Sequence, residues 1–185
     1  PASFSGIGLH SGNRVGMTFL PAPANSGLRF RRVDLEGKPE IEARVENVSE
    51  TTRSTTLARG NIKIHTVEHV LAAFAGCEVD NAIIELDANE PPIADGSARE
   101  FCKMIQGAGV VAQDGKREPY TVTEPIELQM GETLMTLFPG EGLKITCTSA
   151  DHRGRFTQFY SAEITPETWE RELSHARTFC FYEEI

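Results

Sequence analysis

The chain has 185 residues, with 18 Lys and Arg against 27 Asp and Glu and a formal net charge of −9. Hydrophobic residues make up 39% of it and recur throughout, which excludes a generally disordered chain. No run approaches the roughly 18 uninterrupted apolar residues of a membrane-spanning helix, so we predict no transmembrane segment. The negative charge argues against binding of nucleic acid, which requires a basic stripe.

The first third of the chain has the composition of β-strands separated by turns. Strands are expected at residues 14–20, 28–33 and 41–48, with a hairpin within the Thr-rich residues 51–64. Pro21 ends the first strand, and Gly60 interrupts the hairpin. Arg29, Arg31 and Arg32 lie on the second strand, and so small a basic group is more typical of a solvated strand face than of a phosphate-binding track.

A helix follows, and it has the clearest periodic pattern in the chain. Its apolar residues fall at positions i, i+3, i+4 and i+7 and form one stripe: Val67, Val70, Leu71 and Phe74. Thr66 is a candidate N-cap, and Gly76 is a candidate stop signal at the C-terminal end. We therefore expect the helix to begin directly after Thr66.

A second helix is expected after a buried strand at residues 81–87. Ser97 and Glu100 match the S-x-x-E capping box, in which the two side chains satisfy backbone N–H groups at the helix start. Residues 95–96, Asp-Gly, form a turn signal just before this box. Glycines at positions 107 and 109 are expected to end the helix.

A polar, turn-rich segment at residues 113–119 predicts a linker between a first domain, residues 1–112, and a second, incomplete domain, residues 120–185. Strands of the second domain are expected at residues 120–128, 132–138, 143–149 and 156–164. A third helix starts at Thr165-Pro166, with proline at its first position. Strands followed by helices predict an α+β fold, a two-layer sheet-and-helix sandwich in which the first domain is complete and the second, similar domain is truncated.

The four cysteines, at positions 77, 102, 147 and 180, lie far apart and form no C-x-x-C pair. The start of the chain, PASFSGIGLH, lacks the basic beginning and the apolar core of a secretory signal. Reduced thiols in a cytoplasmic protein are therefore expected rather than a disulfide framework. We expect Cys77, Cys102 and Cys147 to be core thiols.

The segment His65-Thr66-Val67-Glu68-His69 carries the chemistry of the candidate site. Glu68 and His69 lie at the start of the predicted helix, where the helix dipole is positive. If His69 binds a metal ion, Glu68 can take a proton from a metal-bound water, as hydrolytic zinc sites require. A surface Glu-His pair without chemical function is the ordinary alternative.

The same segment fits the H-x-x-E-H signature of one class of zinc peptidase. In that class both histidines lie on one helical face and bind the same ion. With Thr66 as the N-cap, His65 falls outside the helix and points elsewhere. The class also needs a distal Glu ligand, and several glutamates are available, so a zinc peptidase stays open as the alternative function.

A series of short motifs runs through nearly all 185 residues. They are Gly6-Ile7-Gly8-Leu9-His10-Ser11-Gly12, Pro21-Ala22-Pro23-Ala24-Asn25-Ser26-Gly27, Arg31-Arg32-Val33-Asp34, Thr66-Val67-Glu68-His69-Val70-Leu71-Ala72-Ala73, Asp80-Asn81, Pro92-Ile93-Ala94-Asp95-Gly96-Ser97 and Ala176-Arg177-Thr178-Phe179. Each motif is weak alone. Together and in this order they resemble the zinc-dependent UDP-3-O-acyl-N-acetylglucosamine deacetylase family, enzymes of lipid A synthesis in Gram-negative bacteria.

The resemblance implies roles for five residues of this sequence. His69 corresponds to one of three zinc ligands, and Glu68 corresponds to the general base. Thr178 matches a threonine whose hydroxyl stabilises the oxyanion, Phe179 matches its neighbour near the substrate sugar, and His10 matches a histidine that lines the cleft. The implied substrate is a UDP-linked acylated amino sugar. The implied reaction is the zinc-dependent hydrolysis of its N-acetyl group, the committed step of lipid A synthesis.

The sequence departs from the family pattern in its second half. The other two zinc ligands of the family are a His and an Asp four residues apart, and the general-acid His follows later. No H-x-x-x-D motif occurs in the second half of this sequence, so one of the three expected ligands is present. We therefore predict that these 185 residues alone do not hold catalytic zinc normally and are essentially inactive.

Overall fold

The structure is a computed structural model that describes residues 1–151, 154 and 156–180. Residues 152–153, 155 and 181–185, which belong to the predicted second domain, lie outside the described residues. The chain divides into two compact units, one formed by Pro1–Gly115 with Trp169–Ile185 and the other by Lys116–Thr168. Sheets and helices occur together without a regular alternation, which confirms the predicted α+β class.

The first unit contains a five-stranded sheet with the strand order β1-β2-β8-β3-β4. Its strands are β1 (Ala2–Ile7), β2 (Arg14–Pro21), β8 (Ala82–Leu86), β3 (Leu28–Arg32) and β4 (Glu40–Glu42). Strands β3 and β8 pair in parallel, whereas the other neighbours are antiparallel. Alternate residues of β2 are buried, namely Val15, Met17 and Phe19, as expected where one face of a sheet is covered.

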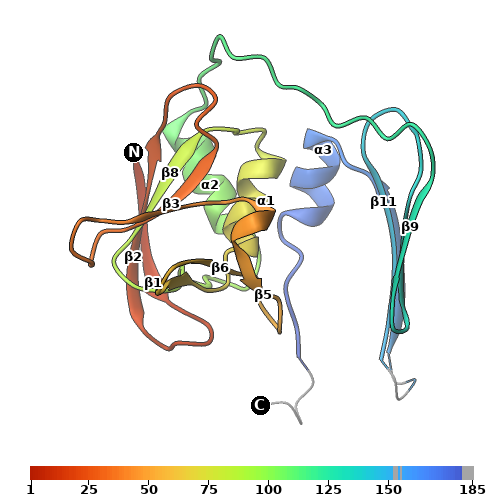
Figure 1. Cartoon of the computed structure of the whole chain (residues 1–185), viewed down its shortest axis with the longest axis horizontal. Coiled ribbons are helices and arrows are strands. Elements are labelled where there is room, and N and C mark those ends of the chain that lie inside the picture. Colours follow the sequence, from red (N-terminus) through yellow and green to blue (C-terminus); the bar gives the residue numbers. More distant parts are fainter. Residues whose placement is uncertain (152–153, 155, 181–185) are drawn as a thin grey trace. The chain divides into compact units, whose positions relative to one another are not determined.

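Two helices, α1 (Glu68–Gly76) and α2 (Arg99–Ala108), lie on one side of this sheet (Figure 1). Phe74 of α1 packs against Phe19 of β2, with the ring centroids 4.7 Å apart. Phe101 of α2 packs edge-on against Phe4 of β1, at 6.4 Å. These contacts place the hydrophobic core of the first unit between the helices and the sheet.

A second, three-stranded sheet of the first unit leads into α1. Its strands are β5 (Val48–Glu50), β6 (Thr56–Arg59) and β7 (Ile62–Ile64). Strands β6 and β7 form the hairpin that the Thr-rich segment predicts. Gly60 lies in its turn with φ of +59°, a left-handed conformation that glycine adopts without strain.

The predicted continuous strand at residues 41–48 is wrong. Strand β4 ends at Glu42, and a 3₁₀ turn, η1 (Val45–Asn47), separates it from β5. The side-chain amide of Asn47 donates a hydrogen bond to the backbone carbonyl of Glu42 at 2.8 Å. This side-chain bond offers the backbone an alternative to an extended ladder, so the chain turns here.

Thr66 is not the N-cap of helix α1, although Gly76 ends the helix as predicted. The cap position is Val67, which makes no side-chain hydrogen bond. Thr66 has a left-handed backbone with φ of +54°, and its hydroxyl donates to the buried carboxylate of Glu90 at 2.7 Å. Thr66 thus precedes the cap position, and its hydroxyl binds Glu90.

The predicted capping box of the second helix does not form either. The cap position of α2 is Ala98 and has no side-chain hydrogen bond. Ser97 Oγ donates to Asp95 Oδ1 at 2.6 Å and accepts from the backbone N–H of Arg99 at 3.2 Å. Glu100 pairs with Lys103 instead of reaching back to the helix start. The helix continues through position 107 and ends at Gly109, which has φ of +78°.

The predicted third helix begins at Pro166, as expected, but it is short and irregular. A turn of α-helix, α3 (Pro166–Thr168), passes directly into a π-helical turn, η2 (Trp169–Leu173). Within the first unit, the Trp169 indole lies so close to Gly76 that a Cβ at this glycine would overlap it. Trp169 therefore connects residues 169–180 to the C-terminal end of α1.

The second unit consists of two antiparallel strand pairs. They are β9 (Ile126–Met130) with β10 (Thr133–Leu137), and β11 (Lys144–Ala150) with β12 (Thr157–Glu163). All four predicted strands are present, although the first begins at Ile126 and not at residue 120. Within residues 116–168, no residue that the structure describes is buried.

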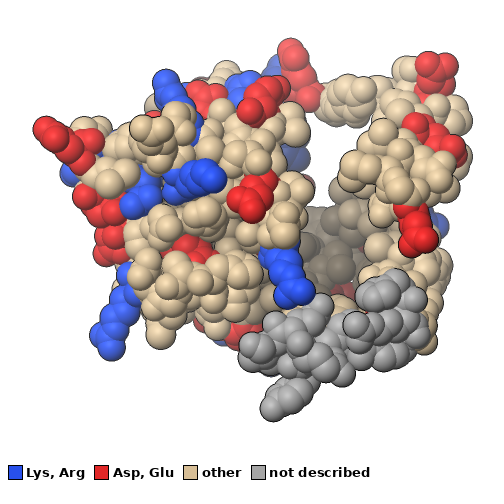
Figure 2. All heavy atoms as spheres, turned by 60° about the horizontal axis from the view of Figure 1, so that its bottom comes forward, with Lys and Arg blue, Asp and Glu red and all other residues tan. Residues whose placement is uncertain are grey.

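Charged side chains of both signs are interspersed on the face of the molecule in Figure 2. No large area of that face carries one sign alone, which agrees with the scattered positions of Lys and Arg in the sequence. Among the described residues, no helix is both long and apolar enough to cross a membrane.

Candidate active site

Glu68 and His69 are the first two residues of α1, directly after the hairpin of β6 and β7. Both side chains are half-buried. Val67 and Val70 on either side of them are fully buried, so this end of the helix is held by the core. Glu68 Oε2 accepts a hydrogen bond from the backbone N–H of Thr55 at 2.9 Å, which orients the carboxylate beside the helix N-terminus.

His65 lies outside the helix, as the sequence predicts. Its Nδ1 is 3.1 Å from the hydroxyl of Thr56, and its backbone N–H donates to the carbonyl of Asn89 at 2.9 Å. His65 and His69 therefore do not share one helical face. The H-x-x-E-H arrangement of a zinc peptidase needs that shared face, so this geometry does not favour the alternative function.

His10 is exposed and lies in the loop between β1 and β2. The loop is closed by two backbone hydrogen bonds, from Gly8 N–H to the Asn13 carbonyl at 3.0 Å and from Gly12 N–H to the Gly8 carbonyl at 3.1 Å. The backbone N–H of His10 donates to Glu90 Oε1 at 3.0 Å. The same carboxylate that holds Thr66 thus also holds the backbone of His10.

Glu90 is a buried carboxylate that the sequence analysis missed. Its side chain is 1% exposed and accepts hydrogen bonds from the backbone N–H groups of His10 and Ser11 and from the Thr66 hydroxyl. Burial by itself raises the pKa of this carboxyl, but the hydrogen bonds outweigh it and hold the pKa below its ordinary value. A single glutamate before two prolines has no periodic or motif signal, so sequence reasoning had nothing with which to find it.

Thr178 lies beside the turn at Asp95 and Gly96. Its backbone N–H donates to the Gly96 carbonyl at 3.0 Å, and the neighbouring Arg177 guanidinium is 3.7 Å from Asp95 Oδ2. The Ser97 hydroxyl and the charge of Arg177 hold the pKa of Asp95 below its ordinary value. The predicted Asp-Gly turn is confirmed. The backbone hydrogen bond to Gly96 ties Thr178 to the turn, and Phe179 beside it is 63% exposed.

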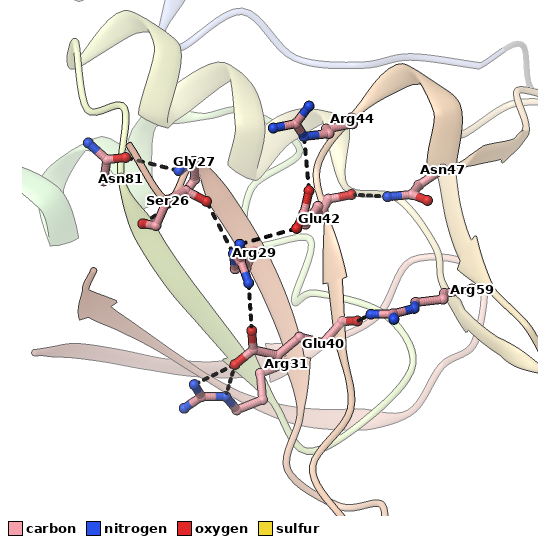
Figure 3. A network of polar contacts seen from close by, with 10 residues as sticks. All are labelled: Ser26, Gly27, Arg29, Arg31, Glu40, Glu42, Arg44, Asn47, Arg59 and Asn81. Atoms are coloured by element: carbon pink, nitrogen blue, oxygen red, sulfur yellow. Dashed lines mark hydrogen bonds and ion pairs between the residues drawn. The ribbon is translucent and has the colours of Figure 1, made fainter. Parts of the chain in front are cut away.

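Arg29 and Arg31 of β3 form a network of ion pairs with neighbouring strands (Figure 3). Arg31 Nε is 2.8 Å from Glu40 Oε1, and its Nη1 is 2.9 Å from Glu85 Oε1. Arg29 Nη2 is 3.1 Å from Glu42 Oε1. The hydrogen bond from Arg31 lowers the pKa of Glu40 below its ordinary value. Because carboxylates of the same sheet already neutralise these cations, the strand is not a phosphate-binding track.

Arg32 differs from the other two arginines of β3, and the expectation of a solvated strand face is wrong for it. The residue is 9% exposed, and its guanidinium is 2.6 Å from Asp34 Oδ2. The hydrogen bonds from Arg32 lower the pKa of Asp34. Arg32 is therefore a paired structural cation near the end of its strand.

His69 is the predicted zinc ligand, and its surroundings test whether this chain completes a zinc site. A catalytic zinc ion takes three protein ligands and a water. Within residues 1–151, 154 and 156–180, no three His, Cys, Asp or Glu side chains lie together as a metal-binding group. His69, with Glu68 next to it, therefore belongs to no such group within the described residues.

The four cysteines are free thiols, in agreement with the predicted absence of a disulfide framework. Cys102 is buried and Cys77 is half-buried. A hydrogen bond from the Cys77 thiol lowers the pKa of Cys102 to about 7. Cys147 and Cys180 are exposed, so the expectation that Cys147 is a core thiol is wrong.

Comparisons with known proteins agree on one family. Residues 1–185 match the family described as UDP-3-O-acyl N-acetylglycosamine deacetylase. The chain is 44% identical to the UDP-3-O-acyl-N-acetylglucosamine deacetylase of Saccharophagus degradans, over 98% of this chain and 61% of that protein. Proteins of the same name from Pseudomonas entomophila and Methylococcus capsulatus are 43% and 42% identical over 98% of the chain. The chain spans about three fifths of the length of these curated relatives.

Proposed function

Because the chain belongs to the UDP-3-O-acyl N-acetylglycosamine deacetylase family, we propose that this protein hydrolyses the N-acetyl group of UDP-3-O-acyl-N-acetylglucosamine. The observation that carries the proposal is the match to this family over residues 1–185, with 44% identity to a relative of that name. The pair Glu68-His69 at the N-terminus of helix α1 supports it, because a carboxylate beside a metal-binding imidazole can act as the general base of a hydrolytic site.

The proposed roles of the site residues follow from their positions. The Glu68 carboxylate, oriented by the Thr55 amide, accepts the proton of the attacking water. The Thr178 hydroxyl, whose backbone is held at the Gly96 turn, donates to the oxyanion that develops on the acetyl carbonyl. Phe179 and His10 contact the substrate. A further acid, from outside the described residues, protonates the leaving amine.

We propose that the reaction depends on zinc and that His69 supplies one ligand. The other ligands then come from residues outside the described part of the chain, since a catalytic zinc ion takes three protein ligands. For the same reason the 185 residues alone are expected to be essentially inactive.

We also propose that the protein works in the cytoplasm, in the synthesis of lipid A. The four free thiols support a reducing compartment, where cysteines stay unpaired. The substrate named by the relatives is a nucleotide-linked acylated amino sugar, which is a biosynthetic intermediate by its chemistry.

The test compares zinc content and deacetylation in the full-length gene product, in the 185-residue chain and in two histidine variants. Formation of the free amine on the UDP-linked sugar, with release of acetate, is followed by mass spectrometry. We expect His69→Ala to abolish both zinc binding and activity, and His65→Ala, the matched control outside the helix, to retain both. Tight binding of one zinc by the 185-residue chain, lost in both variants, would contradict the proposal and favour the H-x-x-E-H peptidase.

A further inference from the structure

We propose that Glu90 is a positioning residue of this site, which fixes the loop that carries His10 against the residue that precedes helix α1. The inference rests on the proposed function, because it concerns the contact of His10 with the substrate. Glu90 itself lies in the segment between β8 and α2, far along the chain from both parts that it joins.

The carboxylate lies at the junction of three segments. His10 and Ser11 donate their backbone N–H groups to it at 3.0 and 2.7 Å, from residues 80 and 79 positions away in the sequence. The Thr66 hydroxyl donates from 24 positions away, at 2.7 Å. One buried charge thus joins the β1–β2 loop to the start of the helix that carries Glu68 and His69.

Gly8 of the loop and Gly6 of β1 both pack closely on the segment that contains Glu90. A Cβ at Gly8 would lie 2.5 Å from Glu90 Oε2, and a Cβ at Gly6 would lie 2.8 Å from Pro92 Cβ. Both distances are shorter than ordinary contacts of a Cβ, so a larger residue at either position would require the neighbouring side chains to move. The motif Gly6-Ile7-Gly8 is therefore explained by close packing of the chain on the segment that contains Glu90.

The loop depends on Glu90 more than the helix does. Besides its bonds to Glu90, the loop is closed by its own backbone, and Asn13 reaches Asn89 by a long hydrogen bond of 3.4 Å. Helix α1 has independent support, because Val67 and Phe74 are buried in the core. Loss of the carboxylate should therefore displace His10 more than Glu68 and His69, and weaken substrate binding more than it slows the chemical step.

The test is the substitution Glu90→Gln in the full-length gene product. Glutamine has nearly the same shape, but its NH₂ group replaces one acceptor oxygen and faces a donor. We expect the KM for UDP-3-O-acyl-N-acetylglucosamine to rise about tenfold or more, as for loss of a buried hydrogen bond to a charge, with kcat within about threefold of wild type. Glu85→Gln is the matched control, because Glu85 lies on β8 and pairs with Arg31 of β3.

An NMR measurement reports on the hydrogen bonds of the loop independently of catalysis. The amide protons of His10 and Ser11, hydrogen-bonded to a carboxylate, are expected to resonate downfield in the NMR spectrum of the full-length protein. They should move upfield in Glu90→Gln and stay in place in Glu85→Gln. Unchanged His10 and Ser11 amide resonances in Glu90→Gln would overturn the inference whatever the activity.

The outcomes separate the two proposals. If the wild-type protein does not deacetylate the substrate, the proposed function is refuted. The amide resonances of His10 and Ser11 still test whether Glu90 holds the loop. An active protein in which Glu90→Gln keeps the wild-type KM refutes the role of Glu90.

If Glu90→Gln does not fold, the KM values of Thr66→Val and Thr66→Ser test the role of Glu90 instead. Of these two variants, only serine keeps a hydroxyl that can donate to the carboxylate. A raised KM in Thr66→Val that Thr66→Ser restores supports the inference, and equal KM values overturn it.

Discussion

Strands in both units of this chain have apolar residues at alternate positions, but these residues are buried in the first unit and exposed in the second. In β2 of the first unit, alternate residues Val15 and Phe19 are 2% and 6% exposed, because helices α1 and α2 cover that face of the sheet. In β9 of the second unit, alternate residues Ile126 and Met130 are apolar too, yet they are 43% and 76% exposed. An alternating pattern therefore predicts a strand and a face, but burial needs a second layer to cover that face.

The largest predicted effect is a difference between the two units in the free energy of unfolding that a buried or an exposed ring contributes. Phe74→Ala removes a ring that is 2% exposed, and we expect it to lower the free energy of unfolding by about 3–5 kcal/mol. Phe159→Ala, the matched change on β12 where the ring is 64% exposed, should cost about 0.5 kcal/mol or less. Urea unfolding of both variants measures the difference. Equal losses would mean that the second unit buries its apolar residues in solution.

A smaller effect concerns how tightly the first unit is packed at Trp169. Gly76→Ala would push a methyl group into the indole, and we expect a loss of about 1–3 kcal/mol in the free energy of unfolding. Gly107→Ala in α2 is the control, because nothing lies within 4 Å of a Cβ there. That substitution should stabilise the helix by about 0.5–1 kcal/mol. A neutral Gly76→Ala would show that the contact between α1 and Trp169 is loose.

The smallest effect is the pH dependence that Glu90 contributes to the first unit. Its pKa is lowered on folding, so its stabilising contribution is complete above the pKa of an unfolded glutamate, about 4.3. The contribution is lost as the pH falls from that value through the lower pKa of the folded protein. We expect the difference in melting temperature between wild type and Glu90→Gln to shrink when the pH is lowered from 6 to 3. A constant difference over this range would show that the Glu90 carboxylate does not titrate with folding.

Much of the first unit could be predicted from local patterns. The hairpin around Gly60, the strand at residues 81–87 and the helix that ends at Gly76 are all present, because alternation, turn glycines and helical periodicity act over a few residues. Neither predicted cap residue occupies the cap position of its helix. Thr66 has a left-handed backbone and donates its hydroxyl to Glu90. The Ser97 hydroxyl donates to Asp95 while its oxygen accepts the backbone N–H of Arg99.

The amino-acid sequence by itself determined the hairpin, the first helix and most of the strands. It also placed Glu68 and His69 together at a helix start and showed that the chain resembles a family of deacetylases. Only the tertiary structure decided which of those strands are buried and which carboxylate holds His10. Local patterns specify backbone conformation, whereas Glu90 acts on residues 24 to 80 positions away. Contacts over such separations exist only once the sheet and helices have assembled, so no window of sequence contains them.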